Sequence, residues 1–522
     1  MERRIPHTMS TQHPDNARPP SWCRGEVIQG EDEVYEAYFS YKELGCEEVM
    51  WDSEGKDVDT RVVRKLLAGY EDYFRERVLG EDVFLTYRIP NPRIEGVERK
   101  IVIETLESIP ISYDIATSFY GRSVKPVFEV ILPFTTDERE PIWLYNCYRA
   151  ATAEVEKVEI GFSETVGKWI GRFEPRSIEV IPLIEDMSSM LRADKIVEPY
   201  IDEVKPDYMR VFLARSDPAL NYGLLSAVTL SKVSLSKLKA LEERKGIPIY
   251  PIIGVGYVPF RGHLSPGNLD RFMEEYRGFS TVTIQSSLKY DLELGTVKRL
   301  VERLNSSLSR REAKPLEFED EAILGLVGKL KARYQKLVEN LAPLINSMVP
   351  YVPKRRARKL HIGLFGYSRS VGRVSLPRAI PFTAVLYSLG MPPEFLGLKA
   401  VEELDEEDWG VVKECYLNFR EDLREAGHFV SWRNLNLLMD SYRTVAKLSR
   451  MREEALAKAI SMYMEDLTVA RETLGIRLGP RSLPHKRYEN VANSVLISYL
   501  EGDEGRLREY FEEAARIRRF VG

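Results

Sequence analysis

Eight short apolar runs constrain the fold of this chain more than any other feature of its sequence. They are rich in β-branched and aromatic residues, and most are continuously apolar, as parallel strands covered on both faces are. The runs are CEEVMWDS from 46, DVFLTYRIP from 82, VFEVILPF from 127, IEVIPLIE from 178, YMRVFLAR from 208, IPIYPIIGV from 247, STVTIQSS from 280 and LHIGLFGY from 360. Helical patterns lie between them, for example at 59–79 and 265–278. This alternation predicts an α/β fold, a (β/α)₈ TIM-type barrel, whose chemistry lies at the C-terminal ends of the strands.

Two further stretches, 292–350 and 381–522, have helical periodicity and high charge and do not fit a plain barrel. We therefore expect a barrel with extra helices and a large helical C-terminal portion, and we predict three regions. Residues 1–45 fold over the active site, and residues 46–380 form the barrel with a helical insertion near 292–350. Residues 381–522 form a helical region packed on the barrel, with the charged helix faces in solvent.

Charge and composition narrow the class of protein. The 522 residues include 75 basic and 80 acidic ones, a net charge of −5, so no overall basic field favours nucleic acid or a membrane as a partner. No apolar run approaches the roughly 20 residues that span a bilayer, and the N-terminus lacks the apolar core of a targeting peptide. The four cysteines are far apart, which argues against a zinc site and a disulfide scaffold. We expect a cytoplasmic protein, with the basic RRARK at 355–359 as a surface turn.

Carboxylates follow the fourth and fifth predicted strands. Glu185 and Asp186 end the segment PLIED, and Asp217 lies in LARSDPALNYG. Acids at neighbouring strand ends can chelate Mg²⁺, which commonly takes one or two protein carboxylates together with substrate oxygens and water. Each acid alone also fits a helix N-cap, particularly Asp217 before Pro218. The residues by themselves leave both interpretations open.

Arginines gather at the same predicted end of the barrel. Arg88 follows the second run, Arg261 follows the sixth, and Arg369, Arg373 and Arg378 follow the eighth. Several guanidinium groups near a metal favour a substrate with phosphate or carboxylate groups, because arginine binds such groups bidentately and stays charged. Taken singly, each of these arginines also fits a surface or ion-pair position.

The N-terminal segment STQHPDNA at 10–17 contains a candidate histidine. Pro14 fixes its own φ and disfavours a helix at His13, so this imidazole is expected on irregular backbone, where functional side chains are common. A lone histidine near a terminus also fits a solvated position. His13 is therefore a candidate that needs support from other residues.

Six motifs supply that support, because in this order they resemble the archaeal-type phosphoenolpyruvate carboxylase family over essentially the whole chain. They are TMSTQHPDN at 8–16, MWDSEGKDVD at 50–59, VIPLIEDM at 180–187, FLARSDPALNYG at 212–223, GVGYVPFRGHLSP at 254–266 and GYSRSVGRVSLPRAIP at 366–381. The resemblance implies that His13, Arg261 and Arg369 are catalytic, that Glu185 and Asp217 bind Mg²⁺ or Mn²⁺, and that Arg88 and Arg378 bind substrate. We assign Arg373, from the same arginine cluster, to substrate binding as well.

The implied reaction joins phosphoenolpyruvate and bicarbonate to give oxaloacetate and phosphate, through carboxyphosphate and a metal-stabilised enolate. Such anaplerotic carbon fixation feeds the tricarboxylic acid cycle. The resemblance also suggests that the protein is a homotetramer and that it binds only small-molecule substrates, with no nucleic acid or membrane as a partner. Two alternatives remain at this point. One is another metal-dependent oxo-acid lyase or aldolase of the same barrel superfamily, and the other is a non-catalytic helical assembly protein built on the charged C-terminal third.

The sequence departs from the pattern of the longer members of the family at several positions. Leu220 stands where they have a lysine, and Val255 stands where their glycine-rich loop has a second arginine. Arg215, two residues before the metal-binding aspartate, is our candidate to compensate in phosphate binding. The chain ends RRFVG instead of Asn-Thr-Gly. Lys447 and Arg487 resemble the site of the inhibitor aspartate, and both also fit solvated positions on helices.

Overall fold

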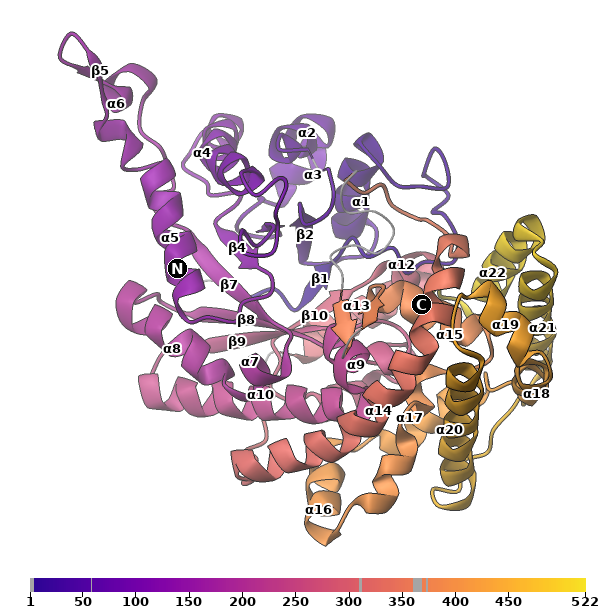
Figure 1. Ribbon diagram of the computed structural model, residues 1–522. Helices are drawn as coiled ribbons and strands as arrows, with labels where there is room; N and C mark the ends of the chain where they lie inside the picture. The colour runs from indigo at the N-terminus through magenta and orange to yellow at the C-terminus, as the bar shows by residue number, and fades with distance from the viewer. Residues whose placement is uncertain (1–3, 58, 309–311, 360–368, 372–373) are drawn as a thin grey trace.

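The computed structural model describes residues 4–57, 59–308, 312–359, 369–371 and 374–522 (Figure 1). Its centre is a closed barrel of eight parallel strands, which confirms the predicted TIM-type architecture. The barrel strands are β1 (Thr8–Ser10), β2 (Glu48–Asp52), β3 (Phe84–Arg88), β4 (Glu129–Leu132), β7 (Glu179–Ile184), β8 (Met209–Ala214), β9 (Ile249–Gly254) and β10 (Thr281–Ile284). Neighbours around the barrel follow the order β1-β10-β9-β8-β7-β4-β3-β2.

Seven of the eight predicted strands are confirmed, and the eighth strand of the barrel is a different segment from the one predicted. The place expected for the run at 360–367 is taken by β1, which pairs with β10 through Thr8 and Val282 and with β2 through Met9 and Glu48. The run at 360–367 itself lies outside the described residues. β1 escapes a search for apolar runs because it has three residues, with one apolar side chain between two polar ones. The N-terminal segment therefore helps to close the barrel before it reaches the mouth.

Two layers of side chains fill the barrel. Apolar residues from the strands form the inner core, namely Met9, Met50, Ile131, Ile181, Leu183, Phe212, Ala214 and Ile252. Below them, at the N-terminal ends of the strands, the buried guanidinium of Arg210 donates to both carboxylate oxygens of Glu48, at 2.8 and 2.7 Å, and to Glu129 at 2.7 Å. This end of the barrel is thus closed by a buried ion group, and the opposite end remains for chemistry.

Helices surround the barrel and extend from it. Those before residue 310 are α1 (Glu31–Lys42), α2 (Val62–Gly69), α3 (Glu71–Glu76), α4 (Ile101–Tyr120), α5 (Arg139–Ala151), α6 (Val166–Ile170), α7 (Met187–Leu191), α8 (Ala193–Val204), α9 (Ser216–Tyr222), α10 (Leu224–Lys245), α11 (Leu269–Glu275), α12 (Ser286–Tyr290) and α13 (Leu294–Ser307). Those that follow are α14 (Asp320–Met348), α15 (Ala379–Ser388), α16 (Glu406–Cys415), α17 (Phe419–Gly427), α18 (Trp432–Asp440), α19 (Tyr442–Leu448), α20 (Glu453–Glu472), α21 (Leu483–Glu501) and α22 (Glu504–Arg518). Among these described helices, none has the length and apolar character needed to cross a membrane.

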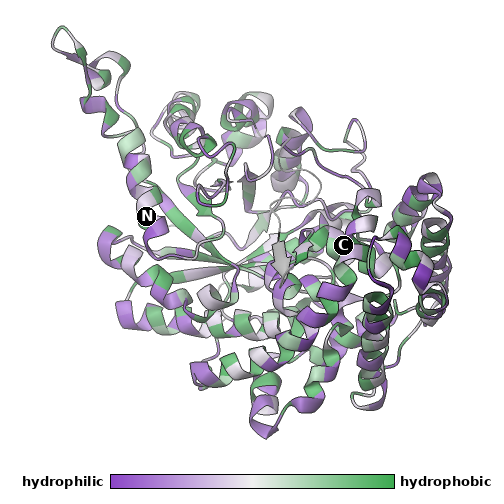
Figure 2. Cartoon of the chain, viewed as in Figure 1, coloured by the Kyte–Doolittle hydropathy of each residue, from purple (hydrophilic) through white to green (hydrophobic). Residues whose placement is uncertain are grey.

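The helices after residue 310 pack on one side of the barrel (Figure 1). One continuous cluster of buried apolar residues runs from the barrel helices through α14 and α15 to α22. Hydrophobic colour is concentrated along the central strands, and the outer helices alternate between hydrophobic and hydrophilic residues (Figure 2). The charged helical segments noted in the sequence are therefore amphipathic layers of a single body, with the long α14 as the first of them.

An arm projects from the opposite side of the barrel. After α5 the chain forms the short hairpin β5 (Glu159–Gly161) and β6 (Glu164–Thr165), followed by α6, and all three lie away from the body (Figure 1). Large apolar side chains on this arm are exposed, among them Phe162, Trp169 at 74% and Ile170 at 62%. The arm therefore exposes several large apolar side chains close together in the sequence.

Candidate active site

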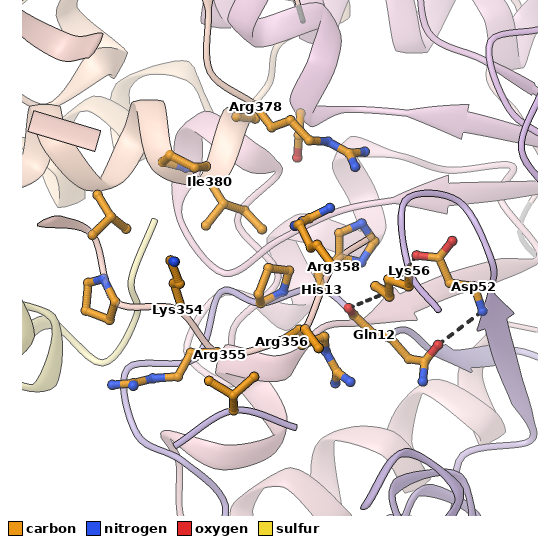
Figure 3. A pocket seen from close by; sticks show the side chains of 18 of the residues that line it. Gln12, His13, Asp52, Lys56, Lys354, Arg355, Arg356, Arg358, Arg378 and Ile380 are labelled. Carbon is orange, nitrogen blue, oxygen red and sulfur yellow. Dashed lines mark hydrogen bonds and ion pairs between the residues drawn. The ribbon is translucent and has the colours of Figure 1, made fainter. Parts of the chain in front are cut away.

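A cavity of about 600 Å³ opens at the C-terminal mouth of the barrel (Figure 3). The ends of β1, β2 and β3 and the loops after β8 and β9 form one side of it, and residues 352–359 and the start of α15 form the other. Its polar lining residues include Gln12, His13, Asp52, Lys56, Arg88, Ser216, Asp217, Arg261, Arg356, Arg358, Lys359 and Arg378. Cations outnumber carboxylates in this lining, so the cavity suits an anionic ligand.

His13 enters the cavity because β1 ends only three residues before it. Its Nδ1 lies 2.8 Å from the Thr11 hydroxyl, and no other described residue bonds to the ring, so Nε2 is free to face the cavity. Burial, followed by the charges of Arg88, Arg261 and Lys56, lowers the pKa of His13 well below its usual value of 6.5. The imidazole is therefore neutral at neutral pH and can accept a proton.

Asp52 and Arg88 face each other across the ends of neighbouring strands. They are register partners of β2 and β3, and the Arg88 guanidinium donates to both oxygens of Asp52, at 2.8 and 2.7 Å. Lys56 Nζ donates to the same carboxylate at 2.6 Å and to the Gln12 carbonyl at 2.9 Å. Burial raises the pKa of Asp52, but the charges of Arg88 and Lys56 outweigh it and lower that pKa overall. One ionised carboxylate thus orients two cations beside His13.

Arg261 is held in place from four directions. It donates to Ser216 Oγ at 3.2 Å, to Asp15 at 3.2 Å, to Gln285 Oε1 at 2.5 Å and to the carbonyl of the last residue, Gly522, at 2.5 Å. Burial lowers the pKa of this guanidinium below its usual value. Both ends of the chain therefore meet at one arginine of the cavity.

A glycine shapes the loop that carries Arg261. Gly262 has a φ of 120°, and a Cβ at this position would lie 2.5 Å from Val255 Cγ1. The Gly256 amide also donates to the Arg261 carbonyl at 2.7 Å, which closes the loop on itself. The backbone turn that aims Arg261 therefore requires glycine.

The three predicted acids occupy two adjacent strand ends. Glu185 directly follows β7 and Asp217 lies in the first turn of α9 after β8, and these two strands are neighbours in the barrel. Asp217 lines the cavity, and its charge acts on Arg261, while the charge of Glu185 acts on Arg88. Asp186 is the N-cap of α7 and accepts from the amides of Ser188 and Ser189. Asp217 makes no such cap, so its alternative interpretation as an N-cap is wrong.

Among the predicted arginines, Arg88, Arg261 and Arg378 line the cavity. Arg369 begins the hairpin strand β11 (Arg369–Val371), which pairs with β12 (Val374–Leu376), but its side chain lies outside the described part, as does Arg373 altogether.

Arg215 takes a different position from the one expected. It is buried behind the cavity lining, where its guanidinium donates to the Tyr276 hydroxyl at 2.9 Å and to the Phe260 carbonyl at 3.4 Å. It supports the Arg261 loop, and its role in phosphate binding stays a prediction. Lys447 on α19 and Arg487 on α21 are exposed and do not line the cavity, so the effector site also stays a prediction.

The basic segment at 355–359 was expected on the surface, and this expectation is wrong. Arg355, Arg356 and Lys359 are 1%, 4% and 7% exposed, and together with Arg358 they line the cavity. Asp52 and Lys56 were also missed, although both belong to the quoted motif at 50–59. The sequence contains a signal for both. The segment PKRRARK at 353–359 has five basic residues and no acid to balance their charge, and Asp52 lies at the end of its strand as Arg88 lies at the end of the next one.

Comparisons with known proteins identify the family to which the chain is similar. The family model described as phosphoenolpyruvate carboxylase matches residues 5–522. A phosphoenolpyruvate carboxylase of Metallosphaera sedula is 47% identical over 520 residues and covers 100% of both chains. Enzymes of the same name from Caldivirga maquilingensis and Picrophilus torridus are each 42% identical over 520 residues. The match covers 100% of both chains for the first enzyme and 99% of both chains for the second.

Proposed function

The chain belongs to the phosphoenolpyruvate carboxylase family, and we propose that its mouth cavity joins phosphoenolpyruvate to bicarbonate to give oxaloacetate and phosphate. The observation that supports this assignment is the gathering of His13, Arg88, Arg261, Arg378 and Asp217 around one cavity at the C-terminal end of the barrel. The reaction brings together two anions, so it needs positive charge that is oriented before the substrates arrive. The ion pairs of Arg88 and Arg261 provide that orientation.

We propose that Glu185 and Asp217 hold a divalent cation. They fit it because both are carboxylates and stand at adjacent strand ends, and Mg²⁺ commonly takes two protein oxygens with the rest from substrate and water. The described residues contain no cluster of three or more His, Cys, Asp or Glu side chains that would suit a closed metal cage. A bound Mg²⁺ or Mn²⁺ would supply Lewis-acid stabilisation to the enolate oxygen.

The protein's own groups divide the remaining work. Arg378 and Arg88 bind and orient the phosphate of phosphoenolpyruvate, and bicarbonate attacks the phosphorus to give carboxyphosphate and the enolate of pyruvate. Neutral His13 then accepts the proton of carboxyphosphate as this breaks into CO₂ and phosphate. Arg261, fixed by Asp15 and Gln285, keeps the CO₂ next to the enolate and excludes water while the carbon–carbon bond forms.

A coupled assay tests the function directly. Malate dehydrogenase oxidises NADH as oxaloacetate appears, and we expect NADH loss that requires phosphoenolpyruvate, bicarbonate and a divalent cation together. A lyase or aldolase would not depend on bicarbonate, and an assembly protein would give no signal. Activity that persists after bicarbonate is removed from the buffers would contradict the proposal.

We also propose that the enzyme is a homotetramer. The exposed apolar arm supports self-association, because a surface of this kind is unfavourable in water and an assembly of identical chains would cover it.

A further inference from the structure

Most arginines of the cavity are neutralised by protein groups. Arg88 is paired with Asp52 and Arg261 with Asp15, while Arg355 donates to Glu512 at 2.9 Å and Arg356 is bonded to Glu36. In each case a carboxylate fixes the guanidinium and balances its charge. Each of these four arginines therefore has a carboxylate partner within the protein, although Nε and Nη1 of Arg356 are buried without an acceptor among the described residues.

Arg358 differs from all of them. Within the described part of the chain it has no hydrogen bond and no ion pair, and its buried Nη1 is left without any acceptor. Its side chain points into the cavity from the segment that precedes residue 360 (Figure 3). A buried donor without a partner is costly, so an unpaired guanidinium facing a cavity indicates an acceptor that the ligand brings.

Arg378 is the second cation of this kind. It lines the same cavity from the N-terminus of α15, and among the described residues no carboxylate pairs with it. Burial, followed by the charge of Arg378, lowers the pKa of Arg358 to about 10, so the two guanidiniums repel each other across the cavity. The nearby carboxylates Asp52 and Glu54 are engaged by Arg88, and their charges offset only part of this lowering.

We propose that Arg358 binds the phosphate group of the substrate together with Arg378, as a two-arginine clamp. The inference rests on the proposed carboxylase function and extends it to a residue outside the six motifs. Two cations without a carboxylate partner among the described residues match a phosphate dianion better than singly charged bicarbonate, and guanidinium forks bind phosphate oxygens bidentately. The clamp would also supply the positive charge that is missing at Leu220, where the longer members of the family have a lysine.

Calorimetric titration of the full-length protein with inorganic phosphate tests the clamp without relying on catalysis. We expect Arg358→Gln to weaken phosphate binding roughly 10- to 100-fold, the range of a lost hydrogen bond to a charged group. The KM for phosphoenolpyruvate should rise by a similar factor, and the KM for bicarbonate should stay the same. Arg358→Lys should fall in between, because lysine keeps the charge and loses the fork.

Lys354→Gln is the matched control, since it removes the same charge from an exposed side chain at the rim of the cavity. Its phosphate affinity should equal that of the wild type because solvent and salt screen an exposed charge. The melting temperature adds an independent readout. Removing an unpaired buried charge should leave the phosphate-free protein at least as stable as the wild type, whereas a structural residue would lower its stability.

The clamp would be overturned if Arg358→Gln bound phosphate as tightly as the wild type, or if Lys354→Gln lost as much phosphate affinity as Arg358→Gln. It would also be overturned if Arg358→Gln raised only the KM for bicarbonate, or if Arg358→Gln without phosphate melted at a lower temperature than the wild type. None of these outcomes affects the proposed function if the wild type still makes oxaloacetate from bicarbonate. A wild type that makes none refutes the function instead, while the titration still reports whether Arg358 holds phosphate.

Discussion

At the scale of single residues, the cavity controls the chemistry of His13. Burial and three neighbouring cations keep its imidazole neutral, and Thr11 fixes the orientation of the ring. A motif identifies such a histidine as a candidate, but the direction of its pKa shift follows from neighbours that lie far away in the sequence. Two predictions concern this residue.

We expect His13→Asn to cleave phosphoenolpyruvate and form little oxaloacetate, because bicarbonate attacks phosphorus before the imidazole is needed. Phosphate release and oxaloacetate formation are measured on the same sample, and their ratio should rise well above the wild-type value of one phosphate per oxaloacetate. A parallel loss of both products would contradict the proton-accepting role. Thr11→Val is the control, because it removes the hydroxyl that contacts the His13 ring and keeps the imidazole itself, so this variant should still form oxaloacetate.

The pH dependence of the enzyme should follow the lowered pKa of His13. The neutral form persists to pH values below 6.5 in the folded protein, so the acidic limb of kcat/KM should lie below pH 6.5. The unfolded chain binds the proton near pH 6.5, so the stability contributed by neutral His13 is lost as pH falls through that value. If the acidic limb of kcat/KM lay at or above pH 6.5 and disappeared in His13→Asn, the pKa of His13 would not be lowered.

At the scale of elements, the ends of parallel strands bring distant residues into contact. Asp52 and Arg88 are separated by 36 residues and form a bidentate pair because β2 and β3 align their last residues. The glycine turn at 262 places Arg261 at the same mouth from β9. Strand register therefore builds the site, and two predictions test its consequences.

Asp52→Asn should release Arg88 and Lys56 from their common carboxylate. We expect the KM for phosphoenolpyruvate to rise roughly 10-fold or more, the effect of losing a charge-assisted hydrogen bond. Steady-state kinetics at saturating bicarbonate measure it. Asp137→Asn is a suitable control, because Asp137 holds exposed Arg139 at 2.6 Å outside the cavity. Equal KM values for the wild type and Asp52→Asn would argue against the orienting role.

Arg210→Met tests the closed end of the barrel, where it leaves Glu48 and Glu129 buried without their cation. Breaking a buried ion pair in this way should lower the free energy of unfolding by about 3–5 kcal/mol. Arg122→Met breaks the exposed pair with Glu81 and should cost less than about 1 kcal/mol. Unfolding of the wild type, Arg210→Met and Arg122→Met in guanidinium chloride measures the difference. An equal loss of unfolding free energy in the two variants would contradict the argument.

At the scale of the whole molecule, the two ends of the chain converge on the mouth of the barrel. The N-terminal segment supplies a strand and His13, and the amide of Val521 donates to the Asp15 carbonyl at 2.7 Å. The C-terminal helices share the buried core of the barrel, so the site and its surroundings are one body. The arm alone extends away from this body.

The arm leads to a prediction about assembly. Replacing Phe162, Trp169 and Ile170 by serine should reduce the sedimenting species from the proposed four copies of the 60.1-kDa chain to a smaller assembly, because the proposed apolar contact would be lost. Val97→Ser changes an equally exposed apolar residue outside the arm and should leave the mass unchanged. A wild type that sediments as a single chain would refute the tetramer, and an unchanged mass in the triple variant would exclude the arm from the interface.

The sequence by itself determined seven barrel strands, the helical layers and the positions of Arg88, Arg261, Asp217 and Arg378 at strand or loop ends. These features are local, because a continuous apolar run or a helical period is visible within a dozen residues. The activity came from six ordered motifs, which periodicity alone would not have identified. Only the tertiary structure decided that β1 closes the barrel, that Asp52 orients Arg88, and that the segment at 355–359 is buried. Each of these depends on contacts between residues far apart in the chain, and a strand of three residues or a lone charge has no local pattern from which such contacts follow.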